Sequence, residues 1–166
     1  MQFVTFRLKD SIPQAKLSEW KEARNNWLRM HPKPWDNQTR TDYNLQFTAP
    51  FEAWLDKGHG SCLLKQTKYR DHLATVLMTD HSTRATFVAW VIMPNHVHLL
   101  FKPKAPLAIL IKTWKGVSAR NMKQGSIWQD NYRDTLIRNV KHFESVVRYI
   151  RKNPKDLPIN TFTLWE

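Results

Sequence analysis

The sequence is poor in the residues that several common kinds of site require. Its 166 residues include one cysteine, Cys62, and only 4 glycines. A single cysteine excludes an internal disulfide and a zinc site built from several cysteines, and it fits a reducing cytoplasm. Neither a G-x-G-x-x-G nor a Walker pattern for cradling phosphates is present. The least polar stretch, 85–101, is interrupted by Pro94 and two histidines, so we expect no membrane span.

Basic residues outnumber acidic ones by a wide margin. The chain has 26 Lys and Arg against 14 Asp and Glu, which gives a formal net charge of +12. Such an excess in a small chain indicates a polyanionic partner, nucleic acid before an acidic membrane. Eight tryptophans suit stacking on unpaired bases, although we expect most of them to lie in the core.

The apolar residues indicate an alternating order of strands and helices. Strands are expected at 3–8, 86–93, 96–102 and 134–138, and helices at 66–79, 107–117 and 143–150. Residues 13–64 differ, because their tryptophans lie at helical spacing among charges, and we expect them to form a helical insertion. The remaining order is the split βαβ of a ferredoxin-like fold, with one extra C-terminal helix. We therefore predict one α+β domain over 1–166, whose antiparallel sheet has helices on one face and an open face opposite.

The most informative motif is a histidine pair, His96 and His98, inside an apolar strand. Residues i and i+2 of a strand project to one face, so the two imidazoles lie together while Val97, Leu99 and Phe101 project into the core. Each ring nitrogen needs a hydrogen bond or a metal when it is buried. The pair therefore indicates half of a metal site, but by itself it fits equally well two histidines on a half-exposed strand.

The last helix offers a second group of polar residues. Tyr149 is off its apolar stripe and lies with Ser145 and Asn153 at i, i+4 spacing. A helix leaning over the open face would bring Tyr149 to the histidines, and Asn153 could offer a neutral oxygen to the same metal. Two imidazoles and an amide oxygen suit Mg²⁺ or Mn²⁺ acting on a phosphate, with a phenolate as nucleophile. Position alone also fits a tyrosine that packs on the core.

A family resemblance favours the first interpretation. The chain resembles the Y1-type HUH transposases, and among them the REP-associated tyrosine transposases, which are relatives of the IS200/IS605 transposases. The resemblance is carried by Trp90-Val-Ile-Met-Pro-Asn-His-Val-His-Leu-Leu-Phe, Ile127-Trp-Gln-Asp-Asn-Tyr-Arg-Asp-Thr-Leu-Ile-Arg and Arg148-Tyr-Ile-Arg-Lys-Asn-Pro, and by Gly58-His-Gly-Ser-Cys-Leu-Leu. It implies metal ligands at His96 and His98, a nucleophile at Tyr149 and an amide ligand at Asn153. The segment after Pro154 departs from the family, which often continues Val-Lys-Ala-Gly-Leu, so no role is assigned to it.

The resemblance implies a metal-dependent endonuclease and strand transferase for single-stranded or hairpin DNA. Tyr149 would form a 5′-phosphotyrosine, with Mg²⁺ or Mn²⁺ as cofactor. Such a protein would be cytoplasmic and associated with the nucleoid, and we favour a monomer over a dimer. We expect DNA contacts from the basic residues of the last two helices, which are Lys112, Lys115, Arg120, Lys123, Arg148 and Lys152. The alternative is a nucleic-acid-binding module without catalysis; a zinc hydrolase is disfavoured because no His-Glu-x-x-His pattern occurs.

Overall fold

The structure is a computed structural model that describes residues 1–166. It divides into two compact units. The first consists of Met1–Lys9 together with Cys62–Glu166, and the second of Asp10–Ser61. The second unit corresponds closely to the segment that we expected to be inserted after the first strand.

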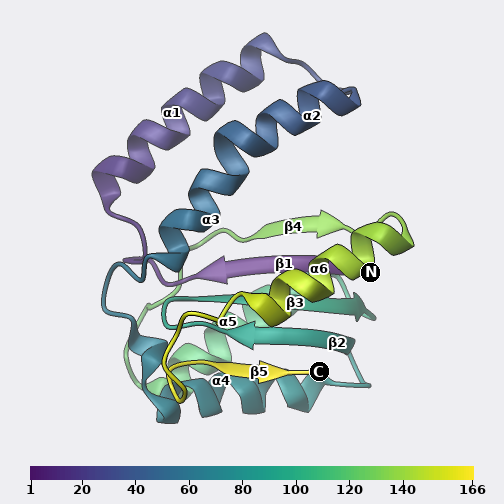
Figure 1. Cartoon of the computed structure of the whole chain (residues 1–166). Coiled ribbons are helices and arrows are strands. Elements are labelled where there is room, and N and C mark those ends of the chain that lie inside the picture. Colours follow the sequence, from purple (N-terminus) through teal and green to yellow (C-terminus); the bar gives the residue numbers. More distant parts are fainter. The chain divides into compact units, whose positions relative to one another are not determined.

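The first unit is built on a five-stranded antiparallel sheet (Figure 1). Its strands lie in the order β4-β1-β3-β2-β5 and span Gln2–Arg7 (β1), Ala85–Ile92 (β2), His96–Pro103 (β3), Arg133–Leu136 (β4) and Thr163–Trp165 (β5). The predicted α+β fold with an antiparallel sheet is therefore confirmed. The histidine pair lies on β3, the middle strand.

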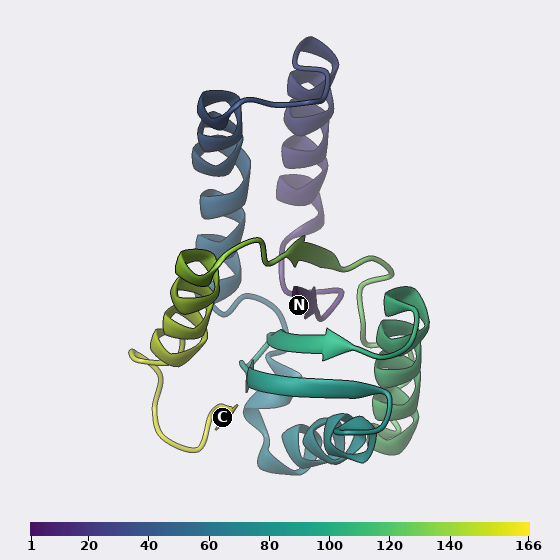
Figure 2. The same ribbon diagram turned by 90° about the vertical axis from the view of Figure 1, so that its right-hand side faces the viewer.

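Helices cover both faces of this sheet. Figures 1 and 2 show α4 (Thr67–Asp80) and α5 (Leu107–Met122) on one side and α6 (Val140–Lys152) on the other. A short 3-10 turn, Leu63–Lys65, precedes α4. All three helices were predicted, because each carries an apolar stripe at helical spacing. No helix is both long and apolar enough to cross a membrane.

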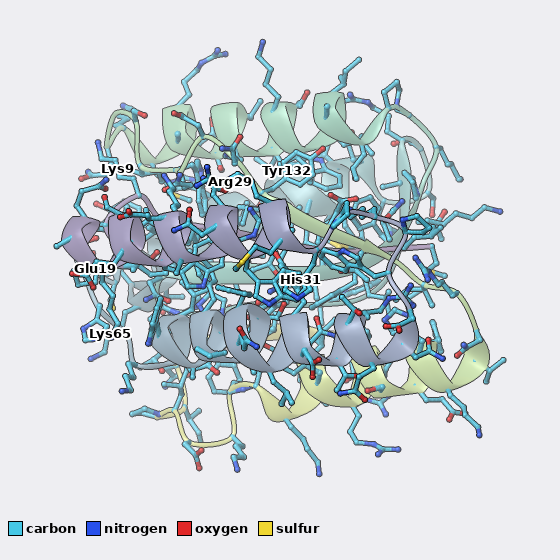
Figure 3. The ribbon with its side chains drawn as sticks, turned by 90° about the horizontal axis from the view of Figure 1, so that it is seen from above. Lys9, Glu19, Arg29, His31, Lys65 and Tyr132 are labelled. Carbon is cyan, nitrogen blue, oxygen red and sulfur yellow. The ribbon has the colours of Figure 1, made fainter.

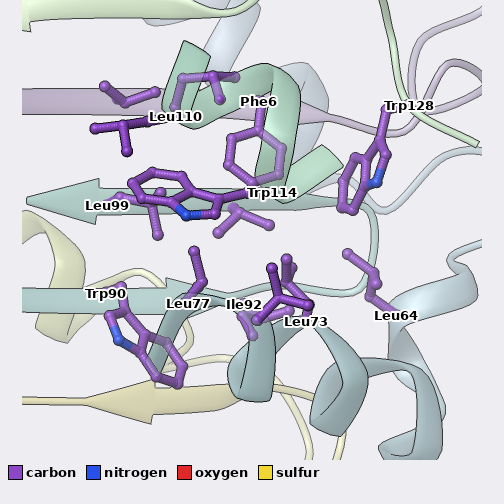
Figure 4. Close-up of a cluster of buried hydrophobic side chains, with 14 of the residues drawn as sticks. Phe6, Leu64, Leu73, Leu77, Trp90, Ile92, Leu99, Leu110, Trp114 and Trp128 are labelled. Atoms are coloured by element: carbon purple, nitrogen blue, oxygen red, sulfur yellow. The ribbon is translucent and has the colours of Figure 1, made fainter. Parts of the chain in front are cut away.

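The main core lies between the sheet and the pair α4 and α5 (Figure 4). Val97, Leu99 and Phe101 all face this core from β3 and are fully buried, as the alternation of the strand predicted. Trp114 of α5 is also fully buried there, and its indole Nε1 donates to Asp80 Oδ2 at 2.8 Å. Because these apolar side chains of β3 face α4 and α5, His96 and His98 point to the opposite face of the sheet.

A second, smaller core lies under α6. Val146 and Ile150 of this helix pack with Phe3, Val91 and Leu100 of the sheet. The apolar stripe of α6 is buried here, so this helix lies over the face of the sheet opposite α4 and α5, where we expected the last helix to lean. His96 and His98 are both 0% exposed, so their predicted place on an exposed face is wrong.

The C-terminal segment is held by a buried arginine, Arg70 of α4. The residue is 2% exposed. Its guanidinium donates to the carbonyl oxygens of Leu64 (3.0 Å), Lys65 (2.7 Å) and Asn160 (2.6 Å), and to the hydroxyls of Thr67 (3.1 Å) and Thr163 (3.0 Å). Burial lowers the pKa of this group from its ordinary value. These contacts hold β5 against β2. The sequence did not predict β5.

The second unit is helical. It contains α1 (Gln14–Met30), α2 (Asn37–Tyr43), a π-helical turn (Asn44–Thr48) and α3 (Ala49–Asp56). Residues of α1 and α3 share a small apolar core with Ile12. Its two ends meet, because the backbone N–H of Ser61 donates to Asp10 Oδ2 at 2.7 Å. Gly60 has φ +87°, and a Cβ there would clash with the Asp10 carbonyl group. The close approach of the two ends therefore requires glycine at this position.

Candidate active site

The two imidazoles of β3 point their outer nitrogens at each other. The Nε2 atoms of His96 and His98 lie 3.0 Å apart, and the rings meet nearly edge to face with centroids 4.7 Å apart. The sequence predicted that the rings share a face. The structure adds that their outer nitrogens converge on one point.

Each inner nitrogen is held by a polar neighbour. His96 Nδ1 lies 2.7 Å from Asn95 Oδ1, and His98 Nδ1 lies 2.8 Å from Thr5 Oγ1. An amide oxygen only accepts, so the proton of His96 is on Nδ1 and its Nε2 carries a lone pair. The Thr5 hydroxyl can accept in the same way from His98 Nδ1–H. Asn95 thus selects the tautomer of His96, and Thr5 is compatible with the tautomer of His98, in which both Nε2 lone pairs converge, as metal-binding histidines require.

Tyr149 reaches this point from α6. Its hydroxyl oxygen is 3.3 Å from His98 Nε2, and the two rings pack edge to face with centroids 5.1 Å apart. Phe3 fixes both groups, since it stacks on His98 at 5.6 Å and meets the Tyr149 ring edge-on at 5.9 Å. The structure therefore brings together two residues that lie 51 positions apart in the sequence.

Asn153 caps the C-terminal end of α6, and its backbone N–H donates to the Tyr149 carbonyl at 2.9 Å. Its side-chain oxygen, Oδ1, is buried and has no hydrogen-bond partner in the structure. A buried amide oxygen without a partner costs about 1–3 kcal/mol, so such an atom needs an explanation. A cation would supply the missing partner one helical turn from Tyr149.

The donor atoms fit a hard divalent ion. Two nitrogens 3.0 Å apart subtend about 90° at an ion about 2.1 Å from each, which is the angle between neighbouring ligands of an octahedral Mg²⁺ or Mn²⁺. No group of three or more His, Cys, Asp or Glu side chains lies close enough to hold a metal. A metal at this site would therefore depend on two imidazoles and the Asn153 amide.

Burial and positive charge keep His98 neutral. Burial, and then the nearby charge of Arg133, lower the pKa of His98 to about 3. Arg133 lies on β4 opposite Thr5, which in turn lies opposite His98, so the three residues form one row across the sheet. Arg7 lies opposite His96 and is 5% exposed. The site thus combines neutral imidazoles, a phenol and cationic side chains on one face of the sheet.

The predicted DNA-binding residues fall into two groups. Arg148 and Lys152 lie exposed on α6, the helix that carries Tyr149. The other four, Lys112, Lys115, Arg120 and Lys123, lie on or at the end of α5, on the other side of the sheet. Lys115 also has a structural contact, since its ammonium group donates to the Gln129 and Asp130 carbonyl oxygens. The structure therefore does not bring the residues of α5 to Tyr149.

Several residues of the site were missed from the sequence. Thr5, Asn95 and Phe3 contact the histidines directly, and Arg133 faces the same side of the sheet. Asn95 carried a signal, because it adjoins the histidine pair in a turn. Thr5 and Arg133 carried none, since their relation to His98 depends on strand pairing over long distances in the sequence.

Comparisons with known proteins identify the family of the chain. The family model described as "Transposase IS200 like" matches residues 61–153, a range that includes His96, His98, Tyr149 and Asn153. No curated protein matches the chain. Among solved structures, a REP-associated tyrosine transposase bound to a REP hairpin is similar, with a TM-score of 0.50 and 16% identity. That similarity covers 93% of this chain and 66% of the other, so this chain spans about two thirds of its length. With more than half of its sequence matched by the family model, the chain belongs to the IS200-like transposase family.

Proposed function

We propose that the protein cuts and rejoins single-stranded DNA through a covalent link to Tyr149. The observation that carries this proposal is the position of the Tyr149 hydroxyl, 3.3 Å from a histidine nitrogen that itself lies 3.0 Å from a second one. A tyrosine that only packed against the core would not need its hydroxyl beside the paired imidazoles. A nucleophile for a phosphate held there needs that position.

The transfer step balances without an external energy source. The Tyr149 oxygen forms a bond to phosphorus, and the bond between phosphorus and the 3′ oxygen of the preceding nucleotide breaks. The phenol loses one proton and the leaving 3′ oxygen gains one, so the products are a 5′-phosphotyrosine and a free 3′-OH. Attack by a 3′-OH on the phosphotyrosine reverses the step and rejoins DNA.

His96, His98 and Asn153 are the residues that would hold a divalent cation. Mg²⁺ or Mn²⁺ bound there would neutralise charge on the non-bridging oxygens of the phosphate. The chain itself keeps His98 neutral by burial, fixes both ring orientations through Asn95 and Thr5, and offers the orphaned oxygen of Asn153. Arg133 adds positive charge on the same face of the sheet.

The proposed substrate is a DNA hairpin with unpaired nucleotides beside its stem. It is supported by the REP hairpin bound to the similar solved structure and by the net charge of +12. Arg148 and Lys152 extend from α6 into solvent and would contact the backbone near the cut. The cytoplasmic, nucleoid-associated location and the monomeric state remain predictions.

The test is to detect the covalent adduct. Purified protein incubated with hairpin DNA and Mn²⁺ should yield a protein–DNA species on a denaturing gel. Tyr149→Phe should abolish it while hairpin affinity stays within a few-fold, because the ring still packs on Phe3 and His98. Tyr43→Phe, a matched change in the Asp10–Ser61 unit, should retain the adduct. An adduct that persists in Tyr149→Phe would refute the proposal. If Tyr149→Phe changes only the stability of the protein, a non-catalytic binding module would be favoured.

A further inference from the structure

A cavity of about 480 Å³ opens beside α5, on the other side of the sheet from the histidine pair. Its helical wall consists of residues three and four positions apart, which form one stripe along α5. Three of them, Ala108, Gly116 and Ala119, are small and leave the wall hollow. The opposite wall comes from the segment between α5 and β4. The cavity therefore has no part in the proposed cleavage site.

Aromatic and apolar groups line the interior of this cavity. Ile127, Trp128 and Tyr132 come from the segment after α5, and Ile111 comes from the helix. The indole of Trp128 is locked, since its Nε1 donates to Ser118 Oγ at 3.1 Å. Burial, and then the charge of Asp134, raise the pKa of Tyr132, so the phenol stays neutral. Figure 3 labels Tyr132 near α5. These groups offer flat, uncharged surfaces to a ligand.

Charged groups complete the lining. Three residues with charged side chains line the cavity, which are Lys112, Lys115 and Asp130. Lys112 is exposed, and Figure 3 shows long nitrogen-tipped side chains extending outward from α5. Lys115 is held by the Gln129 and Asp130 carbonyl oxygens, so its charge is fixed in place. A suitable ligand therefore combines a flat ring with polar edges and an attached anion.

We infer that this cavity binds one unpaired nucleotide of the DNA, an inference that rests on the proposed function. The base would lie against Tyr132, and its phosphate would face Lys112. The volume lies within the range of about 300–1,000 Å³ that small-molecule sites occupy. The net charge of +12 favours an anionic occupant over a second copy of this chain. A nucleotide held on this side of the sheet would anchor the DNA while its scissile phosphate lies at Tyr149.

Gly116 offers a direct way to fill the cavity. It lines the cavity from α5, and a Cβ added there meets no atom within 4 Å. Phenylalanine is also a better helix former than glycine. Gly116→Phe should therefore fold and place a ring where the nucleotide would bind. Asn121→Phe is the matched control, because Asn121 is an exposed residue of α5 that does not line the cavity.

The experiment measures DNA affinity without divalent ions, so that cleavage plays no part. Two hairpins are compared, one blunt and one with a short single-stranded extension. We expect Gly116→Phe to weaken binding of the extended hairpin about tenfold or more, the effect of losing one stacked base, and to leave the blunt hairpin bound as before. Asn121→Phe should bind both hairpins like the unmodified protein. 2-Aminopurine in the extension should be quenched by the unmodified protein and not by Gly116→Phe.

A second variant keeps the test valid if Gly116→Phe does not fold. Lys112→Gln should weaken binding of the extended hairpin and lower the slope of log affinity against log salt by about 0.7, the value for one phosphate contact on a single strand. Equal loss for both hairpins, no loss in either variant, or a changed oligomeric state with unchanged DNA affinity would overturn the inference. Failure of the proposed function is distinct, because it would show as a missing adduct while this binding difference remained.

Discussion

Replacing Thr5 by valine tests whether the histidine pair is built to hold a metal. The Thr5 hydroxyl lies 2.8 Å from His98 Nδ1, and both residues are buried, at 6% and 0% exposure. Valine has nearly the same shape, so Thr5→Val creates no cavity and removes only the hydrogen-bonding oxygen. His98 then keeps its place but loses the hydrogen-bond partner of its Nδ1.

The expected effects on stability and on metal affinity can be separated. Leaving His98 Nδ1 buried without a partner should lower the free energy of unfolding by about 1–3 kcal/mol. Loss of the partner of a metal-binding histidine should weaken metal affinity about 10–100-fold. Thr5→Ser retains the hydroxyl and loses one methyl group, which costs about 1 kcal/mol of stability. We expect this control to bind metal within about threefold of the unmodified protein.

The assay is a titration with Mn²⁺ in the absence of DNA, with free Mn²⁺ followed by electron paramagnetic resonance. Urea unfolding of the same samples gives the free energy of unfolding. If the contact of Thr5 with His98 only stabilises the fold, both variants will lose stability and bind Mn²⁺ equally well. Unchanged Mn²⁺ affinity in Thr5→Val would therefore refute the assignment of Thr5 and His98 to a metal site.

Three further predictions concern stability and charge. Arg70→Met removes the donor to three carbonyl oxygens and two hydroxyls, so we expect the free energy of unfolding in urea to fall by about 3 kcal/mol or more; a change under about 1 kcal/mol would contradict this. Because the pKa of His98 is about 3 when folded and 6.5 otherwise, the unfolded chain binds an extra proton between these pH values, and lowering the pH favours unfolding. In EDTA, the free energy of unfolding should fall by about 1.4 kcal/mol per pH unit below 6.5. His98→Gln should lack this contribution to the pH dependence. Equal pH slopes in both proteins would exclude a contribution from His98. Arg133→Gln removes a positive charge beside His98, so adduct formation should slow about tenfold or more with partial rescue by Arg133→Lys, and equal rates in all three proteins would remove Arg133 from the site.

Much of the fold could be predicted because it depends on local patterns. The alternation in β3 assigned Val97 and Leu99 to the core, and the stripe of α6 assigned Val146 and Ile150 to a buried face. The same periodicities predicted that His96 and His98 share one side of a strand. These inferences need only the geometry of a single element.

The remaining features depend on contacts between distant parts of the chain. Local sequence does not predict the hydrogen bond between Thr5 and His98 or the one between Arg70 and Thr163. Each of these bonds joins residues 93 positions apart. The burial of the histidines was missed for a related reason. The amphipathic pattern of α6 gives the width of its apolar face, but not how completely the helix covers the histidines, so their predicted exposure was wrong.

The meeting of Asp10 and Ser61 has a consequence for how this chain can vary. The helical unit begins and ends at one point, where the Ser61 N–H donates to the Asp10 carboxylate. Each doubling of a loop adds only about 0.6 kcal/mol to the entropy of closing it, so the length between these two residues barely affects the pairing of β1 with β3. Segments of very different size can therefore be exchanged at this junction without changing the sheet. Evolution could replace the whole unit, or shorten it to a tight glycine turn, while Thr5 still reached His98.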